Sequence, residues 1–236
     1  MYLSLVIPAY NEVPRITTSL QQIHAYLSQQ TYDWEVILVD DGSNDGTGEY
    51  VRQSFPWVCV MDHQPNRGKG HAVKRGMLAA TGQFRVYYDA DASTPIDELE
   101  KLWPVFADGV DIIIGSRSLP ESDVQLRQNI IREAMGRTFN LFVKTILGQS
   151  YIDTQCGFKG FTARSTQITF PRQTMDRFAF DAELLHIAGI HGLRVKEIPV
   201  RWINSPQSRV RILSDSMNML IDLMRIRLND LSGRYK

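Results

Sequence analysis

Residues 35–43 read Glu-Val-Ile-Leu-Val-Asp-Asp-Gly-Ser. A short run that is continuously apolar and rich in β-branched residues is typical of a strand buried on both faces. This run ends at Asp40 and Asp41 and then enters a turn at Gly42. Similar short apolar runs predict further strands at residues 3–8, 58–61, 84–88 and 111–115.

Segments with helical spacing lie between these strands. They predict helices at residues 16–27, 47–55 and 70–80, and another that begins near Pro95. Buried strands that alternate with helices indicate an α/β fold, in which a Rossmann-like, mostly parallel sheet carries helices on both faces. In such sheets ligands bind beyond the carboxyl ends of the strands.

Polar clusters recur at those carboxyl ends, and the acidic ones would crowd one rim at an electrostatic cost. The clusters are Tyr10-Asn11-Glu12, Asp40-Asp41-Gly42-Ser43, Asp89-Ala90-Asp91 and Ser116-Arg117. Loops are polar in most proteins, so each cluster alone says little. Their recurrence predicts a ligand site along this rim.

Asp89 and Asp91 flank a single alanine. In extended backbone, the side chains of alternate residues lie on the same face, and their Cα atoms are about 6.6 Å apart. Two carboxylates placed in this way could hold one Mg²⁺ or Mn²⁺ that bridges a diphosphate. The alternative is that Asp91, Ser93 and Thr94 only cap the helix that begins at Pro95.

Two further segments suggest a nucleotide-binding site. Residues 66–70 read Asn-Arg-Gly-Lys-Gly before a predicted helix, so Arg67, Lys69 and free backbone N–H groups could bind phosphate. The segment matches neither a P-loop nor the dinucleotide fingerprint, and it could equally be a glycine turn. A carboxylate of Asp40 or Asp41 could accept hydrogen bonds from a base or ribose, or could simply cap the next helix.

Composition narrows the class of protein. The chain has 236 residues, which suggests one large domain or two small ones, and its 26 basic and 26 acidic residues cancel. Zero net charge argues against a general nucleic-acid binder. Two cysteines exclude a disulfide scaffold. No leader peptide and no apolar run of roughly 20 residues is visible. We therefore expect a cytoplasmic protein or one that lies on a membrane surface.

Two amphipathic segments follow the first half. We expect a long helix at residues 124–147, with an apolar stripe of Ile131, Met135, Phe139, Phe142 and Ile146 beside several basic residues. A last helix is expected at 213–231, with Leu213, Met217, Leu220, Met224 and Leu228 on its apolar face. Such helices could lie at an anionic membrane surface, or could pack on the sheet or in a homo-oligomer.

The ordered set of motifs resembles the family 2 inverting glycosyltransferases, which have the GT-A nucleotide-sugar fold. The matching motifs are residues 4–12, 39–43, 66–70 and 89–91. Residues 115–117, 153–159, 177–183, 197–202 and 208–210 are similar to the polyprenyl-phosphate branch of the family, which includes dolichyl-phosphate glucose and mannose synthases. Residues 153–158 favour the glucosyl type. Relatives with an N-terminal anchor or C-terminal spanning helices differ from this chain, so we expect peripheral attachment.

The resemblance implies the reaction and the domains. A hexose, either glucose from UDP-glucose or mannose from GDP-mannose, would pass with inversion to a polyprenyl or dolichyl phosphate, assisted by Mg²⁺ or Mn²⁺. The GT-A domain would span residues 1–210, with a nucleotide-sugar half at about 1–117 and an acceptor half at about 118–210. Residues 211–236 would form a C-terminal amphipathic helix.

The resemblance also implies roles for individual residues. Asp89 and Asp91 would bind the metal, and these two with Arg117 and Asp153 would form the catalytic set. The donor site would consist of Pro8, Tyr10, Glu12, Asp40, Asp41, Arg67, Lys69 and Asp89. The acceptor site would consist of Arg117, Arg132, Gln155, Lys159, Asp181, Glu183 and Arg209.

The nature of the acceptor decides whether a base is needed. A phosphate oxygen is anionic near neutral pH and can attack unaided if cations such as Arg117, Arg132 and Arg209 hold it. A sugar or protein hydroxyl needs a carboxylate to take its proton, and Asp153 and Asp181 are the candidates. A transferase acting on a soluble glycan or protein hydroxyl is therefore an alternative, and a non-catalytic sugar-nucleotide binder is a second.

Overall fold

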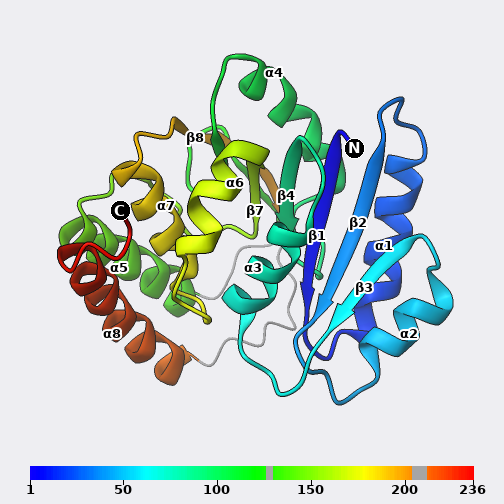
Figure 1. The fold of residues 1–236 in the computed structure, drawn as a ribbon, viewed down its shortest axis with the longest axis horizontal. Coiled ribbons are helices and arrows are strands. Elements are labelled where there is room, and N and C mark those ends of the chain that lie inside the picture. Colours follow the sequence, from blue (N-terminus) through cyan, green and yellow to red (C-terminus); the bar gives the residue numbers. More distant parts are fainter. Residues whose placement is uncertain (126–129, 204–211) are drawn as a thin grey trace.

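The computed structural model describes residues 1–125, 130–203 and 212–236; the side chains of residues 130–134, 137 and 212–216 lie outside that description. Its centre is a seven-stranded sheet with the order β3-β2-β1-β4-β7-β5-β8 (Figure 1). The strands are β1 (Leu3–Ala9), β2 (Trp34–Asp40), β3 (Val58–Asp62), β4 (Phe84–Tyr88), β5 (Ile112–Ser116), β7 (Phe158–Thr162) and β8 (Val195–Pro199). Only β7 runs antiparallel to its neighbours. The mostly parallel α/β sheet is thus confirmed.

Helices cover both faces of the sheet, as predicted. One face packs against α1 (Val13–Leu27), α2 (Thr47–Ser54), the 3₁₀ turn η1 (Ile96–Lys101) and α4 (Leu102–Ala107). The other face packs against α3 (Lys69–Ala79), α5 (Ile130–Leu147), α7 (Phe180–Ile190) and α8 (Ile212–Leu231). The short α6 (Ala163–Thr169) and η2 (Phe170–Arg172) follow β7. Because alternate strand residues face opposite ways, Leu5 joins the first core and Val6 the second.

The expected helix at 124–147 begins only at residue 130. Val124 instead lies in β6 (Asp123–Gln125), which pairs in parallel with β9 (Arg201–Ile203) so that Val124 stands opposite Trp202. The expectation is wrong here because β6 has only three residues and its partner β9 lies far along the chain, so the local sequence shows no strand pattern.

The expected apolar faces of the two long helices are confirmed only in part, and the side chains of Ile131 and Leu213 lie outside the described residues. In α5, Phe139 is buried and Ile146 packs against the core as expected, but Phe142 is 38% exposed, and Val143 and Leu147 are buried instead. In α8 the buried side chains are Met219, Leu223 and Ile226. Most of the stripe predicted for α8 faces outward: the exposed apolar side chains are Met217, Ile221, Met224, Leu228 and Leu231. Apolar residues recur at helical spacing on two sides of α8, and only one of these sides packs against the core.

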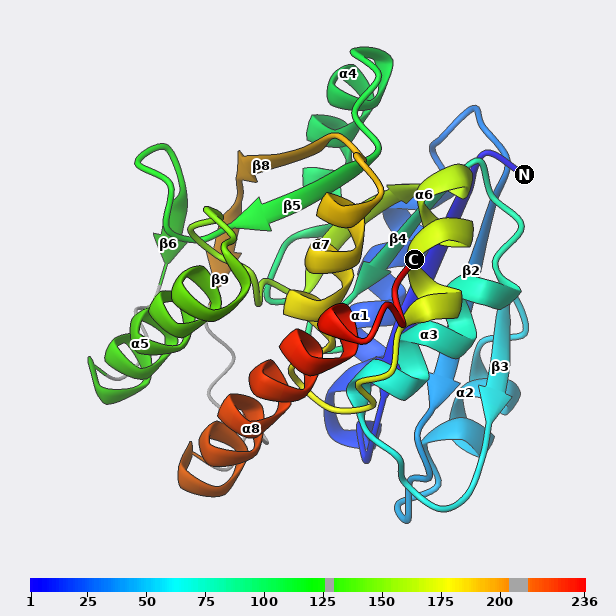
Figure 2. The same cartoon turned by 60° about the vertical axis from the view of Figure 1, so that its left-hand side comes forward.

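The helices α5 and α8 pack against each other beside α7 (Figure 2). Across residues 1–125, 130–203 and 212–236, no helix combines the length and the apolar character that crossing a bilayer requires.

Candidate active site

The polar strand ends lie along one edge of the sheet. β1, β2, β4 and β5 are mutually parallel through the pairing of the sheet, so their carboxyl ends share that edge. Pro8 lies near the end of β1, and Tyr10 follows that strand. Antiparallel β7 brings its first residue, Phe158, opposite Tyr88 at the end of β4. The rim therefore gathers residues from both halves of the chain.

Asp89 lies at the middle of this rim. Lys69, the first residue of α3, places its Nζ 2.6 Å from Asp89 Oδ1. The backbone N–H of Asp89 donates to the carbonyl of Gly157 at 3.0 Å. A Cβ at position 157 would lie 1.8 Å from Asp89 Oδ2, so only glycine leaves room for this carboxylate. Burial lowers the pKa of Lys69, but Asp89, Asp181 and Asp91 outweigh that effect and raise the pKa above its ordinary value.

Asp91 lies two residues further along the same turn. Its Oδ1 accepts one hydrogen bond, from the N–H of Ser93 at 3.0 Å, which is the capping contact considered above. Ala92 between them has φ = 51°, a left-handed conformation that costs a non-glycine residue of the order of 1 kcal/mol. Strained backbone of this kind is common at functional turns.

The acids that follow β2 and β1 make specific contacts within the protein. Asp40 accepts from the N–H groups of Ser43 and Gly48, each at 2.9 Å, and so caps the start of α2. Asp41 accepts from the N–H groups of Arg67 and Gly68 at 2.9 and 2.8 Å. Glu12 is buried, pairs with Arg15 and donates its N–H to Thr47. These acids fix the loops that follow β1 and β2 and the loop before α3.

Arg117, directly after β5, is held by a buried acid. Its Nε and Nη2 donate to the two oxygens of Asp153 at 2.7 and 2.8 Å, and its N–H donates to Oδ2 at 3.0 Å. The guanidinium also lies 5.6 Å from the centre of the Trp202 ring. Burial raises the pKa of Asp153, but Arg117 outweighs this and lowers it below its ordinary value. The side chain of Arg117 remains 28% exposed, so it can still meet a ligand.

Lys159, in contrast, is fully engaged inside the protein. It is 1% exposed, and its Nζ lies 2.7 Å from the Tyr87 hydroxyl, 2.6 Å from the Cys156 carbonyl and 2.6 Å from Asp181 Oδ1. The Tyr87 hydroxyl also donates to Asp181. This buried group joins β4, β7 and the start of α7 directly beneath Asp89.

The remaining acceptor-side candidates lie at different places. Glu183 is fully buried and accepts from Thr174, from the Met175 N–H and from the Tyr235 hydroxyl, which anchors the loop before α7. Gln155 is half-buried, with its side chain near Met219. Arg209 and the side chain of Arg132 lie outside the described residues.

The sequence assigned no site role to three side chains at this rim. Tyr87 and Trp202 support Lys159 and Arg117, and His63 contacts Asp41. Trp202 lies in the matched segment 197–202, but in every case only the fold brings the side chain to its partner.

The chemistry of the acidic pair fits a hard divalent cation. Asp89 and Asp91 offer carboxylate oxygens, which Mg²⁺ and Mn²⁺ prefer. The described residues contain no group of three or more His, Cys, Asp or Glu side chains that could hold a metal by themselves. A cation held by two carboxylates would keep positions open for the phosphate oxygens of a nucleotide, which is how such ions usually bind.

Comparisons with known proteins agree with this geometry. The profile described as Glycosyl transferase family 2 matches residues 4–167. A dolichyl-phosphate beta-glucosyltransferase from Dictyostelium discoideum is 33% identical over 251 aligned residues, which cover 100% of this chain and 77% of the relative. The protein of the same name from Homo sapiens is 32% identical, with 99% and 77% covered.

Solved structures resemble the fold. Glucosyl-3-phosphoglycerate synthase from Mycobacterium tuberculosis, crystallised with Mn²⁺ and UDP, superposes with a TM-score of 0.70 at 19% identity, covering 97% of this chain and 79% of that one. Mannosyl-3-phosphoglycerate synthase from Rubrobacter xylanophilus has a TM-score of 0.69 at 21% identity, covering 99% and 75%. The sheet and its rim define a protein of the GT-A glycosyltransferase fold. More narrowly, the chain belongs to glycosyl transferase family 2.

Proposed function

We propose that this protein transfers a glucosyl group from UDP-glucose, with inversion at C1, to the phosphate of a dolichyl-type polyprenyl phosphate. The observation that carries the proposal is the alignment with dolichyl-phosphate beta-glucosyltransferases, which extends over essentially the whole chain, beyond the nucleotide-binding motifs. The similarity therefore extends over the part of the chain proposed to bind the acceptor as well as the part proposed to bind the donor.

The donor side would use the acids and cations at the ends of β1, β2 and β4. Asp89 and Asp91 would hold the divalent cation, which neutralises charge on the departing diphosphate when it is bound. Lys69 is half-buried, positively charged and next to Asp89, which suits a phosphate-binding role. Pro8, Tyr10, Glu12 and Arg67 would surround the nucleoside, within loops that Asp40 and Asp41 hold in place.

The acceptor side supports a phosphate as the nucleophile. Both oxygens of Asp153 accept from Arg117, and Asp181 is paired with Lys159 and Tyr87, so neither candidate base is poised to take a proton. A phosphate monoester needs no such base, because its second pKa of about 6 leaves it anionic at neutral pH. Arg117, fixed by Asp153 and partly exposed, would orient that phosphate and offset its charge.

A lipid acceptor requires contact with a membrane, and α8 offers a surface for it. Exposed apolar side chains recur every three or four residues along α8 and are 48 to 70% exposed, so they form one outward apolar strip. They are Met217, Ile221, Met224, Leu228 and Leu231. Arg225 and Arg227 border the strip and are 65 and 45% exposed. Arg225 pairs with Asp222 and Arg227 with Asp230, but both guanidinium groups stay exposed, and an anionic bilayer would attract them. We infer peripheral attachment at a cytoplasmic membrane face.

One experiment tests the reaction. The purified protein is incubated with UDP-glucose or GDP-mannose, each with a polyprenyl phosphate, a free glycan or no acceptor, in Mg²⁺, in Mn²⁺ and in a chelator. We expect UDP release and a glucosylated lipid only with UDP-glucose, polyprenyl phosphate and metal. Asp91→Asn keeps an oxygen that can accept from the N–H of Ser93 and removes only the carboxylate charge, so it should stay folded and lose at least 100-fold of this turnover.

Three results would contradict parts of the proposal. Product formed only from GDP-mannose would show that the donor is GDP-mannose and not UDP-glucose. Product formed on the free glycan would show that the acceptor is not a polyprenyl phosphate. Full turnover in the chelator, or in Asp91→Asn, would remove the metal from the mechanism.

A further inference from the structure

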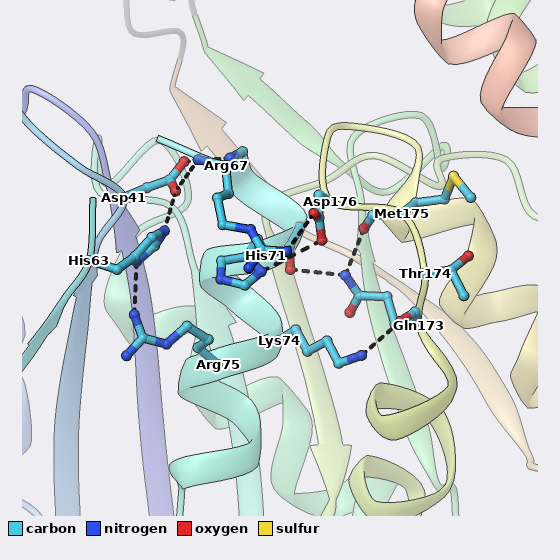
Figure 3. A network of polar contacts seen from close by, with 12 residues as sticks. Asp41, His63, Arg67, His71, Lys74, Arg75, Gln173, Thr174, Met175 and Asp176 are labelled. Carbon is cyan, nitrogen blue, oxygen red and sulfur yellow. Dashed lines mark hydrogen bonds and ion pairs between the residues drawn. The ribbon is translucent and has the colours of Figure 1, made fainter. Parts of the chain in front are cut away.

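Asp41 is saturated by donors from its surroundings (Figure 3). Its side chain is 5% exposed. Oδ1 accepts from the N–H of Arg67 at 2.9 Å and lies 2.9 Å from Nε2 of His63. Oδ2 accepts from Asn66 Nδ2 and from the N–H of Gly68, both at 2.8 Å. The three hydrogen bonds come from residues 66–68, and the fourth contact, from His63, is a close polar contact on Oδ1, so Asp41 helps to set the path of that loop.

His63 is itself oriented by Arg75. The Nη1 atom of Arg75, in α3, lies 2.8 Å from Nδ1 of His63 and also donates to the Asp62 carbonyl at 3.1 Å. A guanidinium can only donate, so Nδ1 must be the unprotonated nitrogen of the ring. The proton then resides on Nε2, the nitrogen that faces Asp41. Arg75 thus selects the tautomer of His63, and in that tautomer the protonated nitrogen lies next to Asp41.

The other side of the loop is clamped as well. Arg67 Nη2 lies 3.2 Å from Asp176 Oδ2, and the N–H of His71 donates to the Asp176 carbonyl at 3.0 Å. Gly68 has φ = 117°, and a Cβ there would lie 2.5 Å from that carbonyl. The loop before Lys69 therefore lies between Asp41 on one side and Asp176 on the other, and Figure 3 shows both. Its position depends on both sides, so a change in the Asp41 carboxylate should shift it.

We propose that His63, oriented by Arg75, is a positioning residue of the donor site. It fixes the carboxylate of Asp41, which fixes residues 66–68 and thereby the start of α3, where Lys69 reaches the rim. This inference rests on the proposed function for the identity of the donor. It assigns His63 an effect on donor affinity, and not on the transfer step or on the acceptor.

The test compares wild type with His63→Phe, His63→Gln and His24→Phe. Phenylalanine keeps an aromatic ring without the N–H, and glutamine supplies an amide N–H that can replace Nε2. His24 is an exposed histidine of α1 among aromatic rings and serves as the matched control. Affinity for UDP-glucose is measured by calorimetry, and kcat and both KM values by UDP release.

We expect His63→Phe to raise the Kd and KM for UDP-glucose at least tenfold, with kcat and the acceptor KM within twofold of wild type. His63→Gln should recover most of the affinity, and His24→Phe should match wild type. Donor affinity within twofold in His63→Phe, or equal losses in kcat and in donor affinity, would overturn the inference. Failure of wild type to bind any sugar nucleotide would instead overturn the proposed function.

A second variant covers the case in which His63→Phe does not fold. Arg75→Met keeps the His63 ring and removes the donor to Nδ1, together with the hydrogen bond from Arg75 to the Asp62 carbonyl. Nitrogen-15 spectra of the ring should show a single tautomer with the proton on Nε2 in wild type, and a mixture in Arg75→Met together with a raised donor KM. A proton on Nδ1 in wild type, or an unaltered tautomer and KM in Arg75→Met, would refute the assignment.

Discussion

Buried acids at the rim act mainly by holding cations and loops in place. Asp153 is the clearest case, because it is 3% exposed and accepts from three donors of Arg117. Removing one partner of a buried ion pair costs about 3–5 kcal/mol, since the other charge is left uncompensated. The pair between Asp153 and Arg117 therefore stabilises the fold, and it also positions Arg117 in the proposed acceptor site.

The pH dependence of this pair has a definite sign. The pKa of Asp153 is lowered from its ordinary value of 3.8, so its contribution to stability is complete above that value and is lost as the pH falls through the folded-state value. We expect Asp153→Asn to lower the free energy of unfolding by about 3 kcal/mol between pH 5 and pH 8. The gap to wild type should shrink below about pH 4. Urea denaturation at each pH measures both.

Asp97→Asn is the matched control for that series. Asp97 also pairs with an arginine, Arg201, but it is 55% exposed, so solvent screens the pair and little stability should be lost at any pH. A gap between wild type and Asp153→Asn that stays constant down to pH 3 would show that the carboxylate charge is not what stabilises the pair.

The sequence could predict the rim because its residues occur as local motifs. Asp89 and Asp91 follow a strand that is apolar enough to recognise, and Asn66 to Gly70 precede a helix. What these side chains contact could not be predicted in the same way. Lys159 and Asp181 pair across 22 residues, and Asp41 meets His63 across 22 as well. Such contacts depend on tertiary packing, which leaves no local signal.

At the scale of elements, the strands that were predicted are those whose residues are mostly apolar. They are the largely buried β1, β2, β4 and β5, and β3 at the edge of the sheet. β7 contains Lys159 and Gly160, and β6 and β9 have three residues each, so none of these gives a recognisable period. The sequence also shows that α8 is apolar, but only packing decides which of its sides is buried.

That two-sided character of α8 gives a testable contrast. Leu228 is 62% exposed on the outward strip, whereas Leu223 is fully buried. Leu228→Glu should leave the melting temperature unchanged but weaken binding to anionic vesicles at least tenfold, because a buried leucine contributes about 1.5–3 kcal/mol and the new charge is repelled. Leu223→Ala should cost about 2–5 kcal/mol of stability and leave vesicle binding by the folded protein intact.

Vesicle sedimentation and thermal denaturation measure the two properties separately. Equal vesicle binding by Leu228→Glu and wild type would remove the outward strip of α8 from the proposed membrane contact, without affecting the proposed reaction.

At the scale of the whole molecule, the sheet does not divide into a donor half and an acceptor half. β7 of the second half lies between β4 and β5 of the first, and β8 extends the sheet beyond β5. The division near residue 117 is therefore a division of proposed roles within one sheet. The segment after residue 211 is also integrated, because Leu223, Ile226 and Tyr235 belong to the core of the second face.

This interleaving predicts one cooperative transition that responds to the far C-terminal end. The Tyr235 ring is fully buried, and its hydroxyl donates to Glu183 at 2.7 Å. Tyr235→Ala should cost about 3–5 kcal/mol, by analogy with other buried aromatic truncations, and lower the melting temperature by about 10 °C. Tyr235→Phe keeps the ring and removes only the hydrogen bond, so its loss should be about 1–3 kcal/mol.

Two probes reveal whether the loss spreads through the sheet. Three of the four tryptophans, Trp34, Trp57 and Trp103, lie in the first half of the chain and the fourth is Trp202, so fluorescence reports mainly on the first half. Far-ultraviolet circular dichroism reports on every helix and strand. Because β4 depends on β7, and β7 contributes to the core that Tyr235 completes, both midpoints should fall by the same amount in Tyr235→Ala. A fluorescence midpoint that stays at the wild-type temperature while the dichroism midpoint falls would mean that the two halves unfold independently, in spite of their shared sheet.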